Sequence, residues 1–245
     1  MPGRPRAILI LGGTREASEL ARRLCRREDV RVISSLAGRT MKPRTGAGEW
    51  RIGGFGGVEG LSTFLHDEGV NTLIDATHPF AETMSLHAAQ AASRTRTPLL
   101  TLLRPAWDRR TGDRWIEVCG LKDAALAIPK GARAFLALGS QHIAAFSERT
   151  DVDFIVRMVD WPAEAPPLAS CELVVGRPGG TTASEIELFR SHSVTCVVSR
   201  NSGGGSYEKI EAARELGIPV IMIARPAPPP GPTYATIDAL LAAID

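Results

Sequence analysis

The sequence predicts an α/β protein built from two Rossmann-like, three-layer domains with mostly parallel sheets and an interdomain cleft. Short aliphatic runs alternate with amphipathic helical patterns along nearly all of the 245 residues. The alternation stops at residues 104–108, where neither periodicity continues, and then begins again. Because 44% of the residues are apolar, each half can bury a core. We therefore expect one domain at residues 1–103 and a second at 104–245.

The first half has the strand and helix pattern of a dinucleotide-binding domain. Its predicted strands lie at residues 8–11, 30–33, 50–52, 72–74 and 98–102, and its helices at 17–25, 58–65 and 82–93. Apolar residues recur three and four positions apart in these helices, which is the spacing of one buried helix face. Strands that alternate with helices in this way form parallel sheets.

The second half repeats the alternation and ends in a proline-rich stretch and a short helix. Its predicted strands lie at 115–118, 134–138, 153–158, 172–175, 194–199 and 219–223, with helical segments at 122–128, 143–147, 184–192, 206–216 and 237–244. The stretch 226–232 cannot be helical because proline removes backbone donors. We expect this half to bind the substrate.

The turn after the first strand predicts an anion site. Gly12 and Gly13 follow the strand, and backbone N–H groups and the positive end of a helix converge at such a turn. The dinucleotide fingerprint is only partly matched, because Thr14 stands where a second glycine is expected, although Ala17 fits. Thr14 can cap the helix and offer its hydroxyl to a phosphate, and Arg15 lies beside it. An ordinary turn with no ligand remains an alternative.

The end of the second strand favours NADP over NAD. NAD sites carry an acidic residue there for the ribose hydroxyl, whereas NADP sites carry small polar residues and arginine. This chain has Ser34 and Ser35, with Arg39, Lys42 and Arg44 close behind. A carboxylate would repel the 2′-phosphate, so its absence favours NADPH. A solvated basic loop is the alternative interpretation.

Two later strand ends complete the predicted cofactor site. Gly53, Gly54 and Phe55 follow the third strand, where glycine allows the backbone to approach a ligand closely or simply to turn. Thr77 and His78 follow the fourth strand, near the nicotinamide position in doubly wound folds. Histidine can transfer protons at neutral pH, although a lone histidine is more often structural.

Scattered cations and polar residues in the second half and at the junction indicate a polyanionic substrate. Several placed cations are needed to fix an anion with many carboxylates, since each charge-assisted bond contributes only about 1.5–3 kcal/mol. The candidate substrate-binding residues are Arg104, Arg177, Arg200, Asn201, Ser202 and Lys209. Together these residues predict an NADPH-dependent reductase of a polyanionic substrate.

Composition excludes several other classes. Lysine and arginine number 29 against 27 acidic residues, so we expect no nucleic-acid partner. The four cysteines have no metal-ligand spacing, and we expect no bound metal and a packing role for the thiols. No P-loop motif, signal-peptide pattern or membrane-length apolar run occurs in the sequence. We therefore expect a cytoplasmic protein and make no prediction of its oligomeric state.

Six stretches, in order along the chain, resemble the CobK/CbiJ family of precorrin-6A reductases in the cobalamin pathway. They are LGGTREA at 11–17, SLAGR at 35–39, GGFGG at 53–57, DATHPFA at 75–81, RPAW at 104–107 and the segment 199–220, which begins SRNSGG and ends LGIPV. The resemblance implies reduction of one macrocycle double bond of precorrin-6A by NADPH, which gives precorrin-6B. The acetate and propionate arms of such a substrate would explain the cations.

The resemblance leaves two chemical points open. The tetrapyrrole is metal-free in the aerobic branch and carries cobalt in the anaerobic one, and the sequence does not separate these. His78, Tyr207 and Lys209 are candidate proton donors by residue type and location, but water or a substrate carboxyl would serve equally. We predict that no single one of these side chains is indispensable as the acid.

Two other functions are alternatives to this one. A non-enzymatic NADP(H)-sensing or anion-binding regulator could use the same fold, since fold does not fix function. A short-chain sugar or polyol dehydrogenase is disfavoured, because those enzymes need a Tyr-x-x-x-Lys pair and neither Tyr207 nor Tyr234 has a lysine four residues later.

Overall fold

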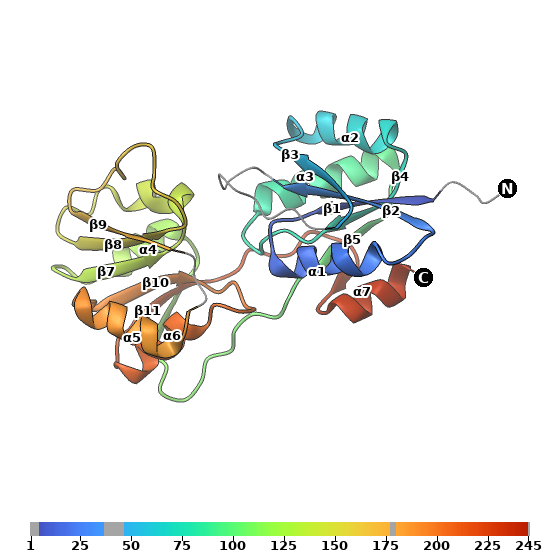
Figure 1. The fold of residues 1–245 in the computed structure, drawn as a ribbon. Coiled ribbons are helices and arrows are strands. Elements are labelled where there is room, and N and C mark those ends of the chain that lie inside the picture. Colours follow the sequence, from blue (N-terminus) through green and yellow to red (C-terminus); the bar gives the residue numbers. More distant parts are fainter. Residues whose placement is uncertain (1–4, 37–46, 177–179, 245) are drawn as a thin grey trace. The chain divides into compact units, whose positions relative to one another are not determined.

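The computed structural model describes residues 5–36, 47–176 and 180–244. The chain forms two compact units, of which unit 1 comprises Met1–Pro105 with Pro226–Asp245 and unit 2 comprises Ala106–Arg225. Each unit has a parallel six-stranded sheet flanked by helices (Figure 1). The predicted α/β fold class is confirmed, while the predicted interdomain cleft stays a prediction.

Unit 1 has the strand order of a dinucleotide-binding fold. Its elements are β1 (Arg6–Leu11), α1 (Arg15–Leu24), β2 (Val30–Leu36), β3 (Glu49–Ile52), α2 (Gly57–Asp67), β4 (Val70–Asp75), α3 (Glu82–Thr95), β5 (Leu99–Leu102), β12 (Thr233–Tyr234) and α7 (Ile237–Ile244). The sheet order is β12-β5-β4-β1-β2-β3. The chain order therefore reverses between β1 and β4, and such a switch point is where doubly wound folds bind ligands.

The central strand of unit 1 is buried on both faces. Ile8 and Ile10 of β1 pack with side chains of α1 and α7, whereas Leu9 and Leu11 pack with side chains of α2 and α3. A strand covered on both sides needs apolar residues at every position, so β1 is a continuous aliphatic run rather than an alternating one.

The C-terminal segment differs from the predicted domain division. The predicted second domain included all of 104–245, whereas β12 pairs with β5 through Thr233 and Thr101 and α7 buries Leu240 in the unit 1 core. The apolar stripe of the last helix indicates burial but not the sheet that buries it, and a two-residue strand has no periodicity to detect.

Unit 2 repeats the strand order of unit 1. Its elements are β6 (Trp115–Val118), α4 (Leu121–Ala127), β7 (Arg133–Ala137), η1 (Ser140–Phe146), β8 (Asp153–Met158), β9 (Cys171–Val175), α5 (Thr182–Ser191), β10 (Cys196–Arg200), α6 (Glu208–Glu215) and β11 (Val220–Ile223). The sheet order is β6-β11-β10-β7-β8-β9. Strands β7 to β11 thus follow the order of β1 to β5, and β6 takes the edge position that β12 takes in unit 1.

The segment after β7 forms a 3₁₀ helix, η1, instead of the start of an ordinary helix. Its buried residues Ile143 and Phe146 are three positions apart, which matches the three-residue turn of a 3₁₀ helix. In unit 2, strand β7 beside the switch point therefore leads into a 3₁₀ helix, whereas in unit 1 the equivalent strand β1 leads into the α-helix α1.

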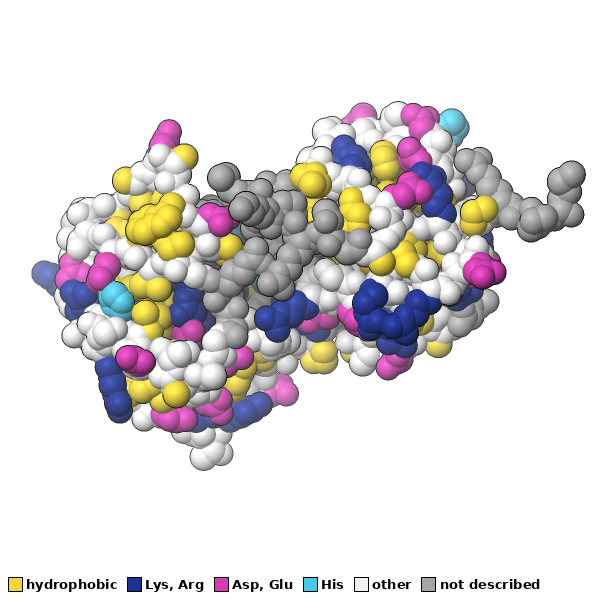
Figure 2. Space-filling model, viewed as in Figure 1, with side chains coloured by type: hydrophobic (Ala, Val, Ile, Leu, Met, Phe, Trp, Pro, Cys, Tyr) yellow, Lys and Arg dark blue, Asp and Glu magenta, His cyan; other side chains and the backbone are white. Residues whose placement is uncertain are grey.

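The surface and the cysteines agree in part with the predictions from composition. Lys and Arg side chains lie among Asp and Glu side chains on the face drawn in Figure 2.

Cys196 is buried, and burial raises the pKa of its thiol to about 12. Cys119 and Cys171 are exposed, so the predicted packing role does not hold for them. Within the described residues, no helix is long and apolar enough to cross a membrane.

Candidate functional site

Backbone hydrogen bonds join the strand ends of unit 1 into one continuous edge. The N–H of Gly12 donates to the carbonyl of Ser35 at 2.9 Å, and the N–H of Gly53 donates to the carbonyl of Leu36 at 2.8 Å. The turns after β1 and β3 are thus both held against the end of β2. The sequence predicted this grouping, because the carboxyl ends of parallel strands meet at one edge of a sheet.

Thr14 ties the turn after β1 to the end of β4. Its hydroxyl accepts a hydrogen bond from the N–H of Ala17 at 3.0 Å, so it caps α1 as expected. The same hydroxyl donates to the carbonyl of Ala76 at 2.8 Å. Its single proton is therefore directed at the protein, and the groups at this turn that suit an anion are backbone N–H groups of the first helical turn. Gly13 has φ +106°, a conformation that favours glycine.

Arg104 lies beside this turn, in unit 1. One of its guanidinium nitrogens is 2.8 Å from a carboxylate oxygen of Glu16, and the two side chains are 16% and 30% exposed. Glu16 is in the first turn of α1, where its charge suits the helix dipole but opposes a bound phosphate. The ion pair reduces that repulsion. Arg104 is thus a predicted substrate-binding residue that pairs within the protein, and no sequence motif indicated Glu16.

Ser34 and Ser35 are both buried in β2, with 4% and 6% exposure. They point to opposite faces of the sheet because neighbouring side chains alternate along a strand. Among the described residues, Ser34 Oγ has no hydrogen-bond partner. A buried hydroxyl without a partner costs free energy, and this atom has almost no accessible surface. Arg39, expected beside these serines, lies outside the described residues.

Arg51, at the end of β3, holds the Gly53–Phe55 turn, although the sequence analysis did not single it out. Its guanidinium donates to the carbonyls of Gly53 at 2.6 Å and Gly54 at 2.8 Å. It also lies 4.0 Å from the centroid of the Phe55 ring, which packs edge-on against Phe64. The available signal was a cation two residues before a glycine run.

Gly60 allows α2 to pack against the same turn. A Cβ atom at this position would lie 1.7 Å from the carbonyl oxygen of Phe55, a distance that no relaxed structure can accommodate. Gly60 therefore permits a close approach of backbone to backbone rather than a positive φ. The turn is fixed from both sides, by Arg51 and by α2.

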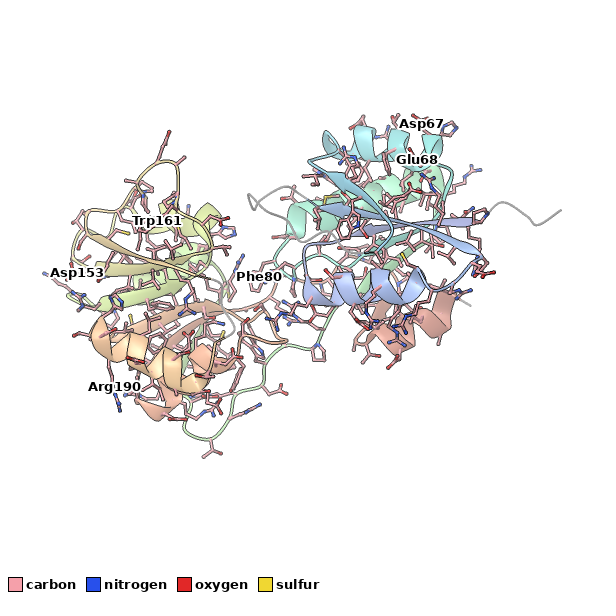
Figure 3. All side chains as sticks on the ribbon, in the orientation of Figure 1. Asp67, Glu68, Phe80, Asp153, Trp161 and Arg190 are labelled. Carbon is pink, nitrogen blue, oxygen red and sulfur yellow. The ribbon has the colours of Figure 1, made fainter. Side chains whose placement is uncertain are left out.

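The end of β4 carries Asp75, Thr77 and His78. Asp75 is 3% exposed, and its carboxylate accepts from the N–H of Thr77 at 3.0 Å and from its hydroxyl at 2.7 Å. His78 Nδ1 accepts from the N–H of Phe80 at 3.3 Å, which directs the proton of a neutral ring to Nε2. Figure 3 shows Phe80 and Glu68 at opposite ends of unit 1, and this loop belongs to the Phe80 end.

In unit 2, Asn201 holds the segment that enters from unit 1. Its side-chain oxygen accepts from the backbone N–H of Trp107 at 2.8 Å, and its side-chain nitrogen donates to the carbonyl of Trp107 at 3.0 Å. The Trp107 indole donates to the carbonyl of Gly204 at 3.0 Å. The Asn201 amide is thus engaged within the protein, whereas the sequence analysis assigned it to the substrate.

Tyr207 and Lys209, at the start of α6, lie against the same entering segment. Lys209 is 7% exposed, donates to the carbonyl of Ser206 at 2.6 Å and lies 4.6 Å from the centroid of a Trp107 ring. Burial lowers the pKa of Lys209 from 10.5 to about 8. The Tyr207 hydroxyl hydrogen-bonds Arg214, and burial raises the pKa of Tyr207.

Two further arginines of unit 2, Arg200 and Arg157, differ in their hydrogen-bond partners. Arg200 donates to the carbonyl of Leu138 at 2.9 Å, which links the ends of β10 and β7 at the switch point of this sheet. Arg157 forms a two-pronged pair with Glu185, with distances of 2.8 and 3.0 Å and side-chain exposures of 11% and 6%. Arg177 lies outside the described residues.

The structure thus gathers the predicted cofactor residues that it describes at one edge of unit 1, and Arg200, Asn201, Ser202, Tyr207 and Lys209 around the turn before α6 in unit 2. No group of His, Cys, Asp and Glu side chains suited to a metal ion occurs among the described residues. A doubly wound unit with a glycine turn before a helix at its switch point is an architecture in which many enzymes bind dinucleotides.

The family model for precorrin-6x reductase CbiJ/CobK matches residues 7–245, and the chain belongs to this family. The predicted family is confirmed. The chain is 44% identical to the precorrin-6A reductase of Rhodococcus erythropolis, over 97% of this chain and 95% of the relative. It is 43% identical to the precorrin-6A reductase of Rhodobacter capsulatus, over 96% and 94%.

A solved structure of CobK precorrin-6A reductase has the same fold, with a TM-score of 0.92 and 42% identity over 98% of this chain and 96% of that one. A more distant relative, the cobalt-precorrin-6A reductase of Priestia megaterium, is 31% identical over 76% of this chain and 77% of its own length. These relatives are reductases, and they give no support to the regulatory alternative.

Proposed function

We propose that this protein reduces one macrocycle double bond of precorrin-6A with NADPH to give precorrin-6B, in cobalamin biosynthesis. The observation that carries the proposal is identity above 40% over nearly the full length of proteins named precorrin-6A reductase. The joined strand ends of unit 1 support it from the geometry. We further propose that the protein works in the cytoplasm.

The residues of unit 1 fit a dinucleotide. Gly13, Thr14 and Arg15 would hold the pyrophosphate through backbone N–H groups, while Gly12, whose N–H donates to Ser35, would hold the turn beside it. Ser34 has a buried hydroxyl without a partner among the described residues. Ser35 and Arg39 would lie toward the adenosine end, and Gly53, Gly54 and Phe55 would line it. Thr77 and His78 would lie toward the nicotinamide. When bound, NADPH supplies a hydride for the ring carbon that accepts it.

The substrate is proposed to be metal-free and rich in carboxylates. Identity to relatives named precorrin-6A reductase exceeds 40%, whereas it is 31% to the relative named for a cobalt-bearing substrate. Arg177, Arg200, Ser202 and Lys209 are proposed to meet the carboxylates. For Arg104, Arg200, Asn201 and Lys209, the proposal competes with internal contacts of those side chains.

Proton delivery is proposed not to depend on one side chain. His78, Tyr207 and Lys209 each have an internal hydrogen-bond partner, and none is fixed as the sole acid. Replacing each in turn should lower the rate of the chemical step without abolishing it, as single-turnover kinetics would measure. Complete loss of that step in one variant that still binds substrate would contradict this proposal.

The decisive experiment mixes the protein with precorrin-6A and NADPH and follows the nicotinamide absorbance together with the product mass. Oxidation of one NADPH per gain of two hydrogens in the product is the expected result. Binding of NADPH without turnover would instead favour a sensing role. Arg39→Ala should weaken NADPH binding by about 1–3 kcal/mol more than NADH binding, and equal losses would show that Arg39 does not contact the 2′-phosphate.

A further inference from the structure

Arg51 is an arginine whose side chain is held by contacts within the protein. Two of its N–H groups donate to the carbonyls of Gly53 and Gly54, and its guanidinium is stacked on Phe55. A guanidinium has five N–H groups, so three remain for other acceptors. A side chain that is held in advance loses little conformational entropy when it binds a ligand.

The charge of Arg51 is not offset by an ion pair, in contrast to most of the arginines that the structure describes in unit 1. Within the described residues, no carboxylate forms an ion pair with Arg51. By contrast, the arginines that pair with a carboxylate in this unit include Arg22, Arg31, Arg94 and Arg104. Carbonyl oxygens hold Arg51 in place but leave its positive charge in need of an anion.

The position of Arg51 specifies which anion fits. Arg51 is the register partner of Ser35, so both side chains leave the sheet on the same face at neighbouring strand ends. In doubly wound folds the end of the second strand is where the adenosine ribose lies, and arginine near it accommodates a 2′-phosphate. The planar fork of a guanidinium suits phosphate oxygens in pairs.

We propose that Arg51 binds the 2′-phosphate of NADPH and thereby determines the preference for NADPH over NADH. This rests on the proposed function, because it requires a nicotinamide cofactor. It deepens that proposal by assigning specificity to a residue of β3, in addition to the residues that follow β2. Arg51 also keeps the Gly53–Phe55 turn in place, so one side chain both shapes the site and recognises the phosphate.

The test measures binding of 2′,5′-ADP and 5′-ADP by calorimetry, which needs no catalysis. The wild-type protein should prefer 2′,5′-ADP. Arg51→Gln should raise the Kd of 2′,5′-ADP by about 10- to 100-fold, the equivalent of one charge-assisted interaction, and change that of 5′-ADP little. Arg51→Lys should give an intermediate value, because it keeps the charge but loses the planar fork. Arg22→Gln removes an exposed arginine of the same unit and should change neither Kd.

The outcomes separate the two proposals. If the wild-type protein prefers 2′,5′-ADP and both Arg51 variants keep that preference, Arg51 does not bind the phosphate and the NADPH assignment stands. Equal weakening of both nucleotides would show that Arg51 only shapes the turn. If the wild-type protein has no preference for 2′,5′-ADP, both proposals are rejected. Should Arg51→Gln fail to fold, the Arg51→Lys ratio decides the question.

Discussion

The two sheets of this protein have the same strand order but differ at the turn that follows the equivalent central strand. In unit 1, β1 leads through Gly12 and Gly13 into the ten-residue helix α1. In unit 2, β7 leads through Gly139 into the 3₁₀ helix η1. Aligned peptide dipoles and unbonded N–H groups at an α-helix start attract anions, whereas a short 3₁₀ helix offers poorer geometry. Equal topology therefore does not give equal binding chemistry.

The two units also differ in how they use polar side chains at the strand ends. In unit 1, Ser34 and Arg51 retain hydrogen-bonding capacity among the described residues. In unit 2, Asn201 and the pair of Arg157 and Glu185 are bonded within the protein. We infer that these polar groups of unit 1 serve to bind a ligand, whereas those of unit 2 stabilise the fold. The following variants test that contrast.

The largest expected effect is at the buried ion pair of unit 2. Glu185→Ala leaves the Arg157 charge buried without its partner and should lower the free energy of unfolding by about 3–5 kcal/mol, as urea denaturation would measure. The double variant Arg157→Met with Glu185→Leu should be close to the wild type. A double variant as unstable as Glu185→Ala would show that packing rather than charge is responsible.

The next effect concerns Asn201. Asn201→Ala leaves the backbone N–H and carbonyl of Trp107 without partners and should destabilise the protein by about 2 kcal/mol, with KM for the substrate little changed. Asn201→Asp keeps the acceptor for the Trp107 N–H and should retain part of the stability. The opposite pattern, unchanged stability with a raised KM, would return Asn201 to the substrate site.

A smaller effect is expected at the helix cap of unit 1. Thr14→Ala removes the cap of α1 and the bond to Ala76, which should cost about 1–2 kcal/mol in thermal or urea unfolding. Thr14→Ser keeps the hydroxyl and should restore most of that stability. If Thr14→Ser and Thr14→Ala are equally unstable, the methyl group and not the hydroxyl is what matters.

The smallest effect is a pH dependence due to Lys209. Burial lowers its folded-state pKa to about 8, below the 10.5 of the unfolded chain, so the unfolded state binds more protons above pH 8. Its contribution to stability should therefore rise with pH, by about 1 kcal/mol between pH 8 and 9. The rise should be absent in Lys209→Met and present in Lys122→Met, which removes an exposed lysine. A rise that persists in Lys209→Met would reject this source.

The raised pKa of the buried Cys196 thiol changes stability with pH in the direction opposite to the effect of Lys209. Cys196 keeps its proton in the folded protein while the unfolded thiol loses it, so its contribution to stability falls as pH rises above about 9. The Lys209 effect must therefore be taken as the difference between the wild type and Lys209→Met at each pH, measured by urea denaturation.

Local sequence patterns were sufficient to predict most of the architecture and the residues that follow the strand ends of unit 1. The aliphatic run at 8–11 and the following glycines identified β1 and its turn, because burial on both faces and a reversal of direction each require particular residue types. The same patterns could not show that Thr14 donates to Ala76, 62 residues away, or that Glu16 pairs with Arg104.

By itself, the sequence determined the α/β class, the strand-end residues and the family. Only the tertiary structure decided that β12 and α7 belong to unit 1, that Asn201 holds Trp107, and that Arg51 grips the Gly53–Phe55 turn. Periodicity is a local property, set by which face of an element is buried. Pairing between distant segments depends on how the chain closes long loops. The hydrogen bonds that decide whether a polar side chain is already bonded within the protein form only after that closure.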